Sequence, residues 1–239
     1  KYKVRGELPS MSRPMYETLM TGTPSHVHGI TCNEIVRRSN QTSIFSLCRQ
    51  SGLVSGAAAY FWMSELYNRA PFDKHRDRIQ FETGDGLIDY GMYYWEDAYP
   101  DSHLFMDGEM IRKIYHPDFM LYHPMSIDLA GHTCGADSRE YAGKVADMGV
   151  LIADILPFWL EDGYQVVVTA DHGMDENGIH CGIADLQRDV PLYIFSPLVE
   201  NGRFEDHYIG QRNIAPMLCR LLGLKASDAM ISPDEIRFK

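Results

Sequence analysis

The sequence predicts an α/β fold, in which a mostly parallel sheet carries helices on both faces. Three apolar runs lack polar alternation, which is typical of strands that are buried on both sides: Phe119–Tyr122, Val166–Thr169 and Pro191–Phe195. Helical patterns alternate with these runs, and such alternation indicates a sheet covered by helices. The length of 239 residues suits a single domain, so we expect one domain over 1–239 without a large cap domain.

The helices are predicted from the spacing of apolar residues and from end signals. The longest extends from Ser138 to Leu160, where Ser138 is a suitable N-cap. Shorter helices are expected at Ile44–Gln50 and Ile214–Leu222. The run Ala57–Trp62 is a further strand candidate, although its small residues also suit a helix.

Two regions do not follow this alternation. Residues 72–107 are rich in aromatic residues, Gly and Asp without a clear period, so we expect a loop or a small insert over one face. The segment Lys1–Val4 has the pattern of the middle of a strand and is not preceded by a Met. We therefore expect that the first strand of the domain is missing from this sequence.

The amino-acid composition limits which binding partners and which cellular compartment we expect. The net charge of −11 argues against a nucleic-acid partner, because binding the phosphate backbone requires a basic patch. The five cysteines are odd in number and form no CxxC pair, which favours a reduced, cytoplasmic setting. No apolar run approaches the ~20 residues that span a bilayer, so no membrane partner is expected. Homo-oligomerisation is left open.

Three imidazoles and two carboxylates follow predicted strands. Asp128 and His132 come after the first apolar run, and Asp171 and His172 come after the second. His180 follows within a short stretch flanked by glycines, which allow the backbone to bend back. Because ligands of open α/β sheets bind at the carboxyl ends of strands, the set predicts a site for divalent metal ions, of which Zn²⁺ suits these ligands. A single histidine alone is more often a core or surface residue.

The nucleophile is predicted at the start of the first helical segment. Pro14 suits a first helical turn, which places Ser12 at or just before the N-terminus of a helix. The orphan amides and the dipole of a helix N-terminus stabilise an alkoxide or a phosphoryl group there. The alternative for Ser12, taken alone, is a simple N-cap.

Together these motifs resemble the alkaline phosphatase superfamily, in its type I phosphodiesterase/nucleotide pyrophosphatase branch. The resemblance extends over nearly all of the chain and implies an alkaline phosphatase-like fold. It is carried by four segments in this order: Ser12-Arg13-Pro14, Asp128 to His132, Asp171-His172-Gly173-Met174 and Gly178-Ile179-His180.

The resemblance also implies the role of each motif. One zinc ion would be held by three side chains, those of Asp128, His132 and His180. The other would be held by Asp171, His172, the Ser12 oxygen and one further aspartate on the family's first strand. No aspartate precedes Ser12 in this sequence. Either the segment that carries it lies outside this sequence, or the second metal site is incomplete.

These observations predict a metal-dependent hydrolase of phosphate mono- or diesters. The expected route is a phosphoseryl intermediate on Ser12 at a two-zinc site, with a small-molecule phosphate ester as substrate. Arg13 is a candidate for contact with a substrate oxygen, and a solvent-facing salt bridge is its alternative. Two other interpretations stay open: a sulfatase, phosphonate hydrolase or phosphomutase on the same scaffold, and a non-catalytic metal-binding domain.

Overall fold

The computed structural model describes residues 1–81 and 84–239, and it has the α/β fold that the sequence predicts. The strands are β1 (Tyr2–Arg5), β2 (Ser55–Tyr60), β3 (Ile79–Phe81), β4 (Tyr90–Tyr94), β5 (Phe119–Tyr122), β6 (Val166–Thr169), β7 (Asp189–Phe195) and β8 (Phe204–Gly210). The helices are α1 (Ser12–Thr21), α2 (Ser25–His28), α3 (Ile44–Gln50), α4 (Trp62–Tyr67), α5 (Lys74–Asp77), α6 (Asp101–Tyr115), α7 (Ser126–Cys134), α8 (Arg139–Glu161), α9 (Asp185–Arg188) and α10 (Ile214–Leu222), with a 3₁₀ turn at Gln211–Asn213.

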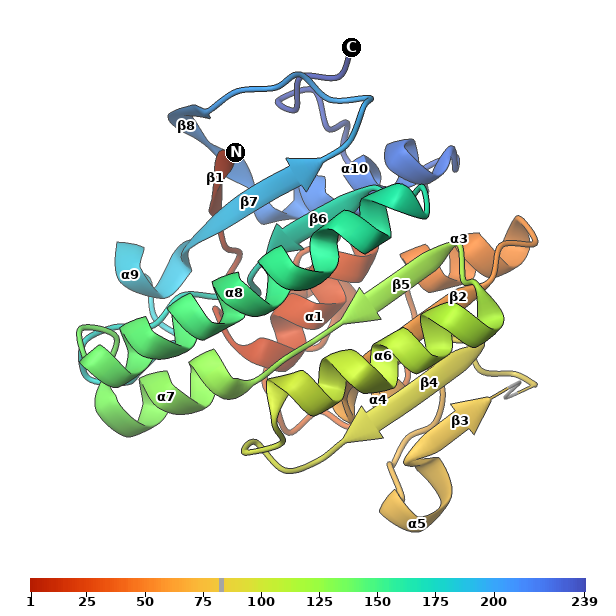
Figure 1. Ribbon diagram of the computed structural model, residues 1–239, viewed down its shortest axis with the longest axis horizontal. Helices are drawn as coiled ribbons and strands as arrows, with labels where there is room; N and C mark the ends of the chain where they lie inside the picture. The colour runs from red at the N-terminus through yellow and green to blue at the C-terminus, as the bar shows by residue number, and fades with distance from the viewer. Residues whose placement is uncertain (82–83) are drawn as a thin grey trace.

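The strands form two four-stranded sheets, ordered β6-β7-β1-β8 and β3-β4-β2-β5. Helices cover both faces, as Figure 1 shows, with α6 and α8 on the near side and α1 behind. The larger core cluster packs side chains of α1, α3 and α10 against the strands, and a smaller one joins α6, α8 and β6. Of the described helices, none is both long and apolar enough to cross a membrane.

Both sheets contain parallel pairs, and two of the predicted strands, β6 and β7, run antiparallel to each other. β2 pairs in parallel with β4 and β5, but β6 and β7 pair antiparallel, as do β1 and β7. A parallel neighbour requires a crossover connection of a dozen or more residues, usually an α-helix that packs on a face of the sheet. The connection from β6 to β7 contains only the four-residue helix α9, so the chain turns back beside its own strand.

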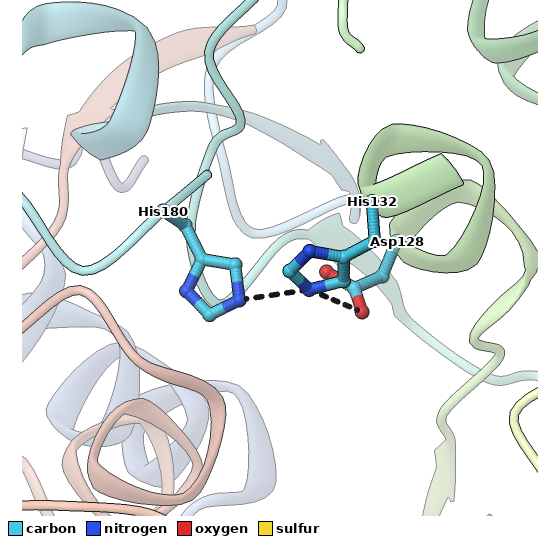
Figure 2. A group of neighbouring side chains, drawn as sticks. All are labelled: Asp128, His132 and His180. Atoms are coloured by element: carbon cyan, nitrogen blue, oxygen red, sulfur yellow. Dashed lines mark hydrogen bonds and ion pairs between the residues drawn. The ribbon is translucent and has the colours of Figure 1, made fainter. Parts of the chain in front are cut away.

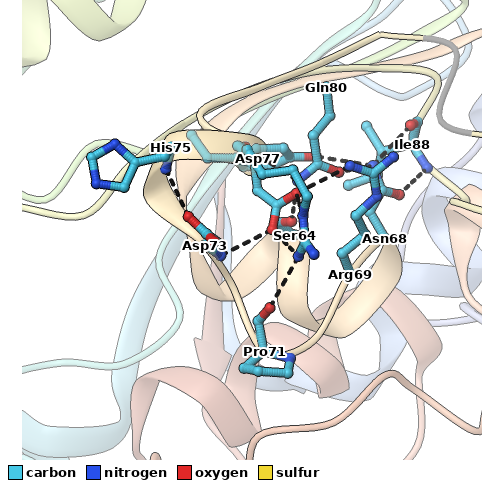
Figure 3. Close-up of polar contacts among 11 residues, drawn as sticks. Ser64, Asn68, Arg69, Pro71, Asp73, His75, Asp77, Gln80 and Ile88 are labelled. Carbon is cyan, nitrogen blue, oxygen red and sulfur yellow. Dashed lines mark hydrogen bonds and ion pairs between the residues drawn. The ribbon is translucent and has the colours of Figure 1, made fainter.

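Residues 72–107 are not the loop or insert that the sequence predicts. They contain α5, β3, β4 and the first turns of α6, while residues 82 and 83 lie outside the described part of the chain. The buried Asp77 side chain anchors the segment, because it accepts hydrogen bonds from Arg69 and from the backbone N–H of Asp73 (Figure 3). Gln80 links β3 to α4 through the Ser64 hydroxyl. Within this stretch, β3 and β4 are therefore strands of the second sheet.

The predicted helices are found close to their expected bounds. The Ser138 hydroxyl accepts a hydrogen bond from the N–H of Tyr141 and so caps α8. Helix α10 ends at Gly223, whose φ of 69° is the left-handed conformation that glycine adopts at little cost. The ambiguous run at residues 57–62 divides into the end of β2 and the start of α4.

Candidate active site

Two segments bring Asp128, His132 and His180 together. Helix α7 follows β5 and carries Asp128 and His132, which lie one turn apart and so share one face. The loop after β6 contributes His180, whose side chain points towards these two in Figure 2. The conformation of this loop depends on Gly178, which has a φ of 73°.

A backbone carbonyl fixes the tautomer of each histidine. The Nδ1 atoms of His132, His172 and His180 lie 2.8, 2.9 and 3.0 Å from the carbonyl oxygens of Gly178, Gly173 and Ser10. A carbonyl oxygen only accepts hydrogen bonds, so each Nδ1 donates its proton to it. Each Nε2 atom is then left with a free lone pair, which is the form that binds a metal ion.

The first group of ligands has the dimensions of a zinc site. The Nε2 atoms of His132 and His180 lie 3.2 Å apart, and the Asp128 Oδ2 atom lies 3.5 Å from the His132 Nε2 atom (Figure 2). Two lone pairs and a carboxylate at these distances repel one another unless a cation lies between them. In a tetrahedral site with Zn–N bonds of about 2.0–2.1 Å, the ligand atoms are about 3.3 Å apart. Asp128, His132 and His180 therefore fit a zinc ion.

A second, smaller group lies beside the first. The Nε2 atom of His172 is 3.2 Å from the Asp171 Oδ2 atom and 3.1 Å from the Ser12 Oγ atom. The rings of His172 and His180 stack with their centroids 3.8 Å apart, so the two groups adjoin. This second group has two metal-binding side chains besides Ser12, which is fewer than a closed zinc site uses.

The electrostatics of both groups favour a bound cation. Burial raises the pKa of Asp171 to about 6 and also raises the pKa of Asp128. Burial lowers the pKa of His172 and His180, so the imidazoles resist protonation. In addition, the Asp128 Oδ1 atom is buried without a hydrogen-bond partner among the described residues. A divalent cation would balance the carboxylates and give this oxygen a partner.

Ser12 does not cap its helix. It is the first residue of α1, the N-cap is Met11, and the Ser12 hydroxyl is directed to the imidazole of His172. The simple N-cap alternative is therefore wrong, and the hydroxyl lies at the junction of a helix N-terminus and the second group of ligands. This position suits a nucleophile that attacks an anionic group.

Comparison with known proteins identifies the family. The profile of the family described as type I phosphodiesterase/nucleotide pyrophosphatase matches residues 1–190. The chain belongs to this family. Its membership of the alkaline phosphatase superfamily follows, and the resemblance that the motifs predict is confirmed.

The fold of this phosphodiesterase family member is found in solved structures of low sequence identity. Murine ectonucleotide pyrophosphatase/phosphodiesterase 5 superposes with a TM-score of 0.74 at 14% identity, covering 98% of this chain and 90% of that chain. A phosphonate monoester hydrolase from Silicibacter pomeroyi gives 0.61 at 13% identity, covering 97% and 68%. At these identities the likeness concerns the fold alone.

The curated relatives are much longer proteins. The catalytic subunit of human GPI ethanolamine phosphate transferase 3 is 33% identical over 110 residues, which are 45% of this chain and 10% of that protein. The catalytic subunit of human GPI ethanolamine phosphate transferase 2 is 24% identical over 229 residues, or 90% of this chain and 22% of that protein. The chain thus spans between a tenth and a quarter of their length.

Two residues beside Ser12 have roles that the motifs do not predict. The guanidinium of Arg13 is buried, lies 2.7 Å from Glu65 and covers the Trp62 ring, so it faces neither substrate nor solvent in this conformation. The N–H of Arg13 donates to the Asn33 Oδ1 atom at 3.0 Å. This contact leaves the Asn33 NH₂ group beside the N-terminus of α1. Asn33 lies far from every motif in the sequence, and no spacing signal identifies it.

Proposed function

We propose that this phosphodiesterase family member cleaves phosphate esters and that Ser12 is its nucleophile. The observation that carries the proposal is the position of the Ser12 Oγ atom, 3.1 Å from the His172 Nε2 atom at the N-terminus of α1. A serine that merely capped the helix would direct its hydroxyl to an amide of the first turn. Here the hydroxyl is directed to a side chain that is suited to hold a metal ion.

Two zinc ions fit the proposed chemistry. Asp128, His132 and His180 would hold one, and Asp171, His172 and the Ser12 oxygen would take part in holding the other. Zinc at these positions would act as a Lewis acid, lowering the pKa of the Ser12 hydroxyl and balancing the charge of the phosphoryl oxygens. The dimensions of the first group and the orphaned oxygen of Asp128 support this ligand assignment.

The chain's own residues account for the other parts of the reaction. The Ser12 oxygen forms a bond to phosphorus while the bond from phosphorus to the leaving oxygen breaks. The Ser12 proton passes to solvent, and the leaving alkoxide takes up a proton from solvent to depart as the alcohol. The NH₂ group of Asn33, held in place by the N–H of Arg13, donates to a non-bridging phosphoryl oxygen. A water oxygen then bonds to phosphorus as the bond to the Ser12 oxygen breaks, and a proton from this water restores the Ser12 hydroxyl. The product is phosphate from a monoester or a phosphate monoester from a diester.

A transferase is the second candidate. The curated relatives are named GPI ethanolamine phosphate transferases. Their name describes the transfer of ethanolamine phosphate to GPI rather than to water. The first half of the reaction on Ser12 would be the same. The two candidates differ only in whether water or an alcohol attacks the phosphoseryl group.

The test uses p-nitrophenyl phosphate and bis-p-nitrophenyl phosphate with protein that is first chelated and then given zinc. We expect turnover to depend on zinc and to be abolished by Ser12→Ala. Ser43→Ala is the matched control, because Ser43 is a buried serine at the N-terminus of α3 that does cap its helix. It should lower stability and retain turnover.

Each result has a defined meaning. Turnover that survives Ser12→Ala would exclude Ser12 as nucleophile. Zinc binding without turnover of either substrate would favour the non-catalytic metal-binding domain. Adding ethanolamine or glycerol as acceptor distinguishes the candidates, because a transferase forms the new phosphate ester in place of inorganic phosphate. The ratio of monoester to diester turnover then separates a phosphatase from a phosphodiesterase.

A further inference from the structure

The Tyr16 hydroxyl is buried without a hydrogen-bond partner. The side chain is 1% exposed, and its oxygen has no partner of acceptable geometry among the described residues. Buried tyrosine hydroxyls usually have a partner, because leaving such a group unpaired costs the hydration that it had in the unfolded chain. An orphaned hydroxyl in this position therefore indicates a contact that forms only when the site is occupied.

The hydroxyl faces the candidate active site. Tyr16 lies one helical turn after Ser12 on α1, so the two side chains share a face of the helix. Burial raises the pKa of Tyr16 well above its usual value, with Asp171 and Asp128 adding to the effect, whereas the nearby Ser12 hydroxyl lowers it. A tyrosine hydroxyl is protonated at neutral pH, so this phenol is able to donate a hydrogen bond.

Packing holds the Tyr16 ring in this orientation. The His123 imidazole meets it edge-on with the ring centroids 4.6 Å apart, and the Trp62 ring lies 6.2 Å away at a tilt. Burial lowers the pKa of His123 to about 4, so this neighbour stays neutral at physiological pH. A donor fixed before the reaction needs no reorganisation when charge develops near it.

We propose that the Tyr16 hydroxyl donates a hydrogen bond to the Ser12 oxygen when that oxygen carries negative charge. The charge develops as Ser12 loses its proton to attack phosphorus, and again as the phosphoseryl bond breaks. The hydrogen bond therefore forms in the transition states of both half-reactions and is absent from the resting site. This proposal rests on the proposed function of Ser12 and adds Tyr16 to its machinery.

The test is Tyr16→Phe, which removes the hydroxyl and keeps the ring. A hydrogen bond to a charged oxygen is worth enough that kcat should fall by roughly 10- to 100-fold, with KM changed less than about 2-fold. The melting temperature should stay equal or rise, since no hydrogen bond of the resting protein is lost. The matched control is Tyr67→Phe, whose hydroxyl donates to the buried Glu17 at 2.8 Å. It should lower the melting temperature and keep kcat.

Orthovanadate binding to the zinc-loaded protein, measured by calorimetry, separates this proposal from that of Ser12. Vanadate adopts the five-coordinate geometry of the transition state, so Tyr16→Phe should weaken its binding about 10-fold or more. If the wild type turns over no ester, the proposed function fails, and the vanadate result still decides the role of Tyr16. A kcat within 2-fold of wild type, unchanged vanadate affinity, or a melting temperature lowered as in Tyr67→Phe would overturn it.

Discussion

Breaking the buried ion pair between Arg13 and Glu65 should strongly destabilise the protein. Both side chains are almost completely buried, and the guanidinium nitrogen lies 2.7 Å from the Glu65 Oε2 atom. The other carboxylate oxygen accepts the N–H of Phe72 at 2.9 Å. Glu65→Gln removes the charge, and its amide offers only one oxygen for these two donors. A buried guanidinium would then lack its counter-ion.

The magnitude follows from the burial of the pair. Removing one partner of a buried pair costs about 3–5 kcal/mol, because the remaining charge is desolvated without compensation. The Trp62 face, 4.6 Å from the guanidinium carbon, offsets part of this, since a desolvated cation–π contact contributes about 2 kcal/mol. A net loss of about 2 kcal/mol should lower the melting temperature by roughly 4–8 °C in a chain of this size.

Thermal unfolding followed by circular dichroism measures this loss. The control is Asp85→Asn, which breaks an exposed pair with Arg38 and should cost less than about 1 kcal/mol. The double variant Arg13→Met/Glu65→Gln should recover much of the stability, because no buried charge is left unpaired. A melting temperature of Glu65→Gln within about 1 °C of wild type would refute the reasoning. An equal decrease in the melting temperature of the control Asp85→Asn would refute it as well.

Two further predictions concern His28 and Gly178. Burial lowers the pKa of His28 from 6.5 to about 4, and its Nδ1 atom accepts the Ile30 N–H, so the unfolded chain takes up the proton first. The free energy of unfolding should therefore fall by up to about 3 kcal/mol as the pH drops from 6.5 to 4. Urea titrations at several pH values should show that this dependence on pH is reduced in His28→Gln and unchanged in His26→Gln, since His26 is exposed. Gly178→Ala should weaken zinc binding measured by calorimetry, because a φ of 73° disfavours alanine and the new Cβ would lie 2.6 Å from the Gly131 carbonyl oxygen. The control is Gly52→Ala, where φ is also 73° but no atom lies near the new Cβ. This control should lower stability without changing zinc affinity.

Elements with strong local signals could be predicted from the sequence. β5 and β6 begin and end where their apolar runs do, and α8 begins after the Ser138 cap. A continuous apolar run or a capping residue determines the backbone within a few residues, so no distant partner needs to be known. The residues of the candidate metal site could also be predicted, since Asp128 and His180 belong to short motifs that follow predicted strands.

Elements that depend on distant partners could not be predicted. β4 has the sequence Tyr-Gly-Met-Tyr-Tyr, in which Gly91 interrupts any apolar period. The Tyr93 ring occupies the space that a Gly91 side chain would fill, so this glycine serves packing within the sheet. In the same way, the buried partner of Arg13 and the contact to Asn33 are set by segments that meet only in the folded chain.

The less complete group of ligands lies where the sheet is divided. Among the described residues β5 and β6 pair on one side only, each at the edge of its own sheet, and the two groups of ligands follow these two edges. α8 holds the edges in place, because Trp159 packs against Tyr122 of β5 and the Tyr164 hydroxyl donates to the Pro117 carbonyl oxygen ahead of that strand. The packing of α8 against both edges therefore sets how far apart the Asp128 and Asp171 side chains lie.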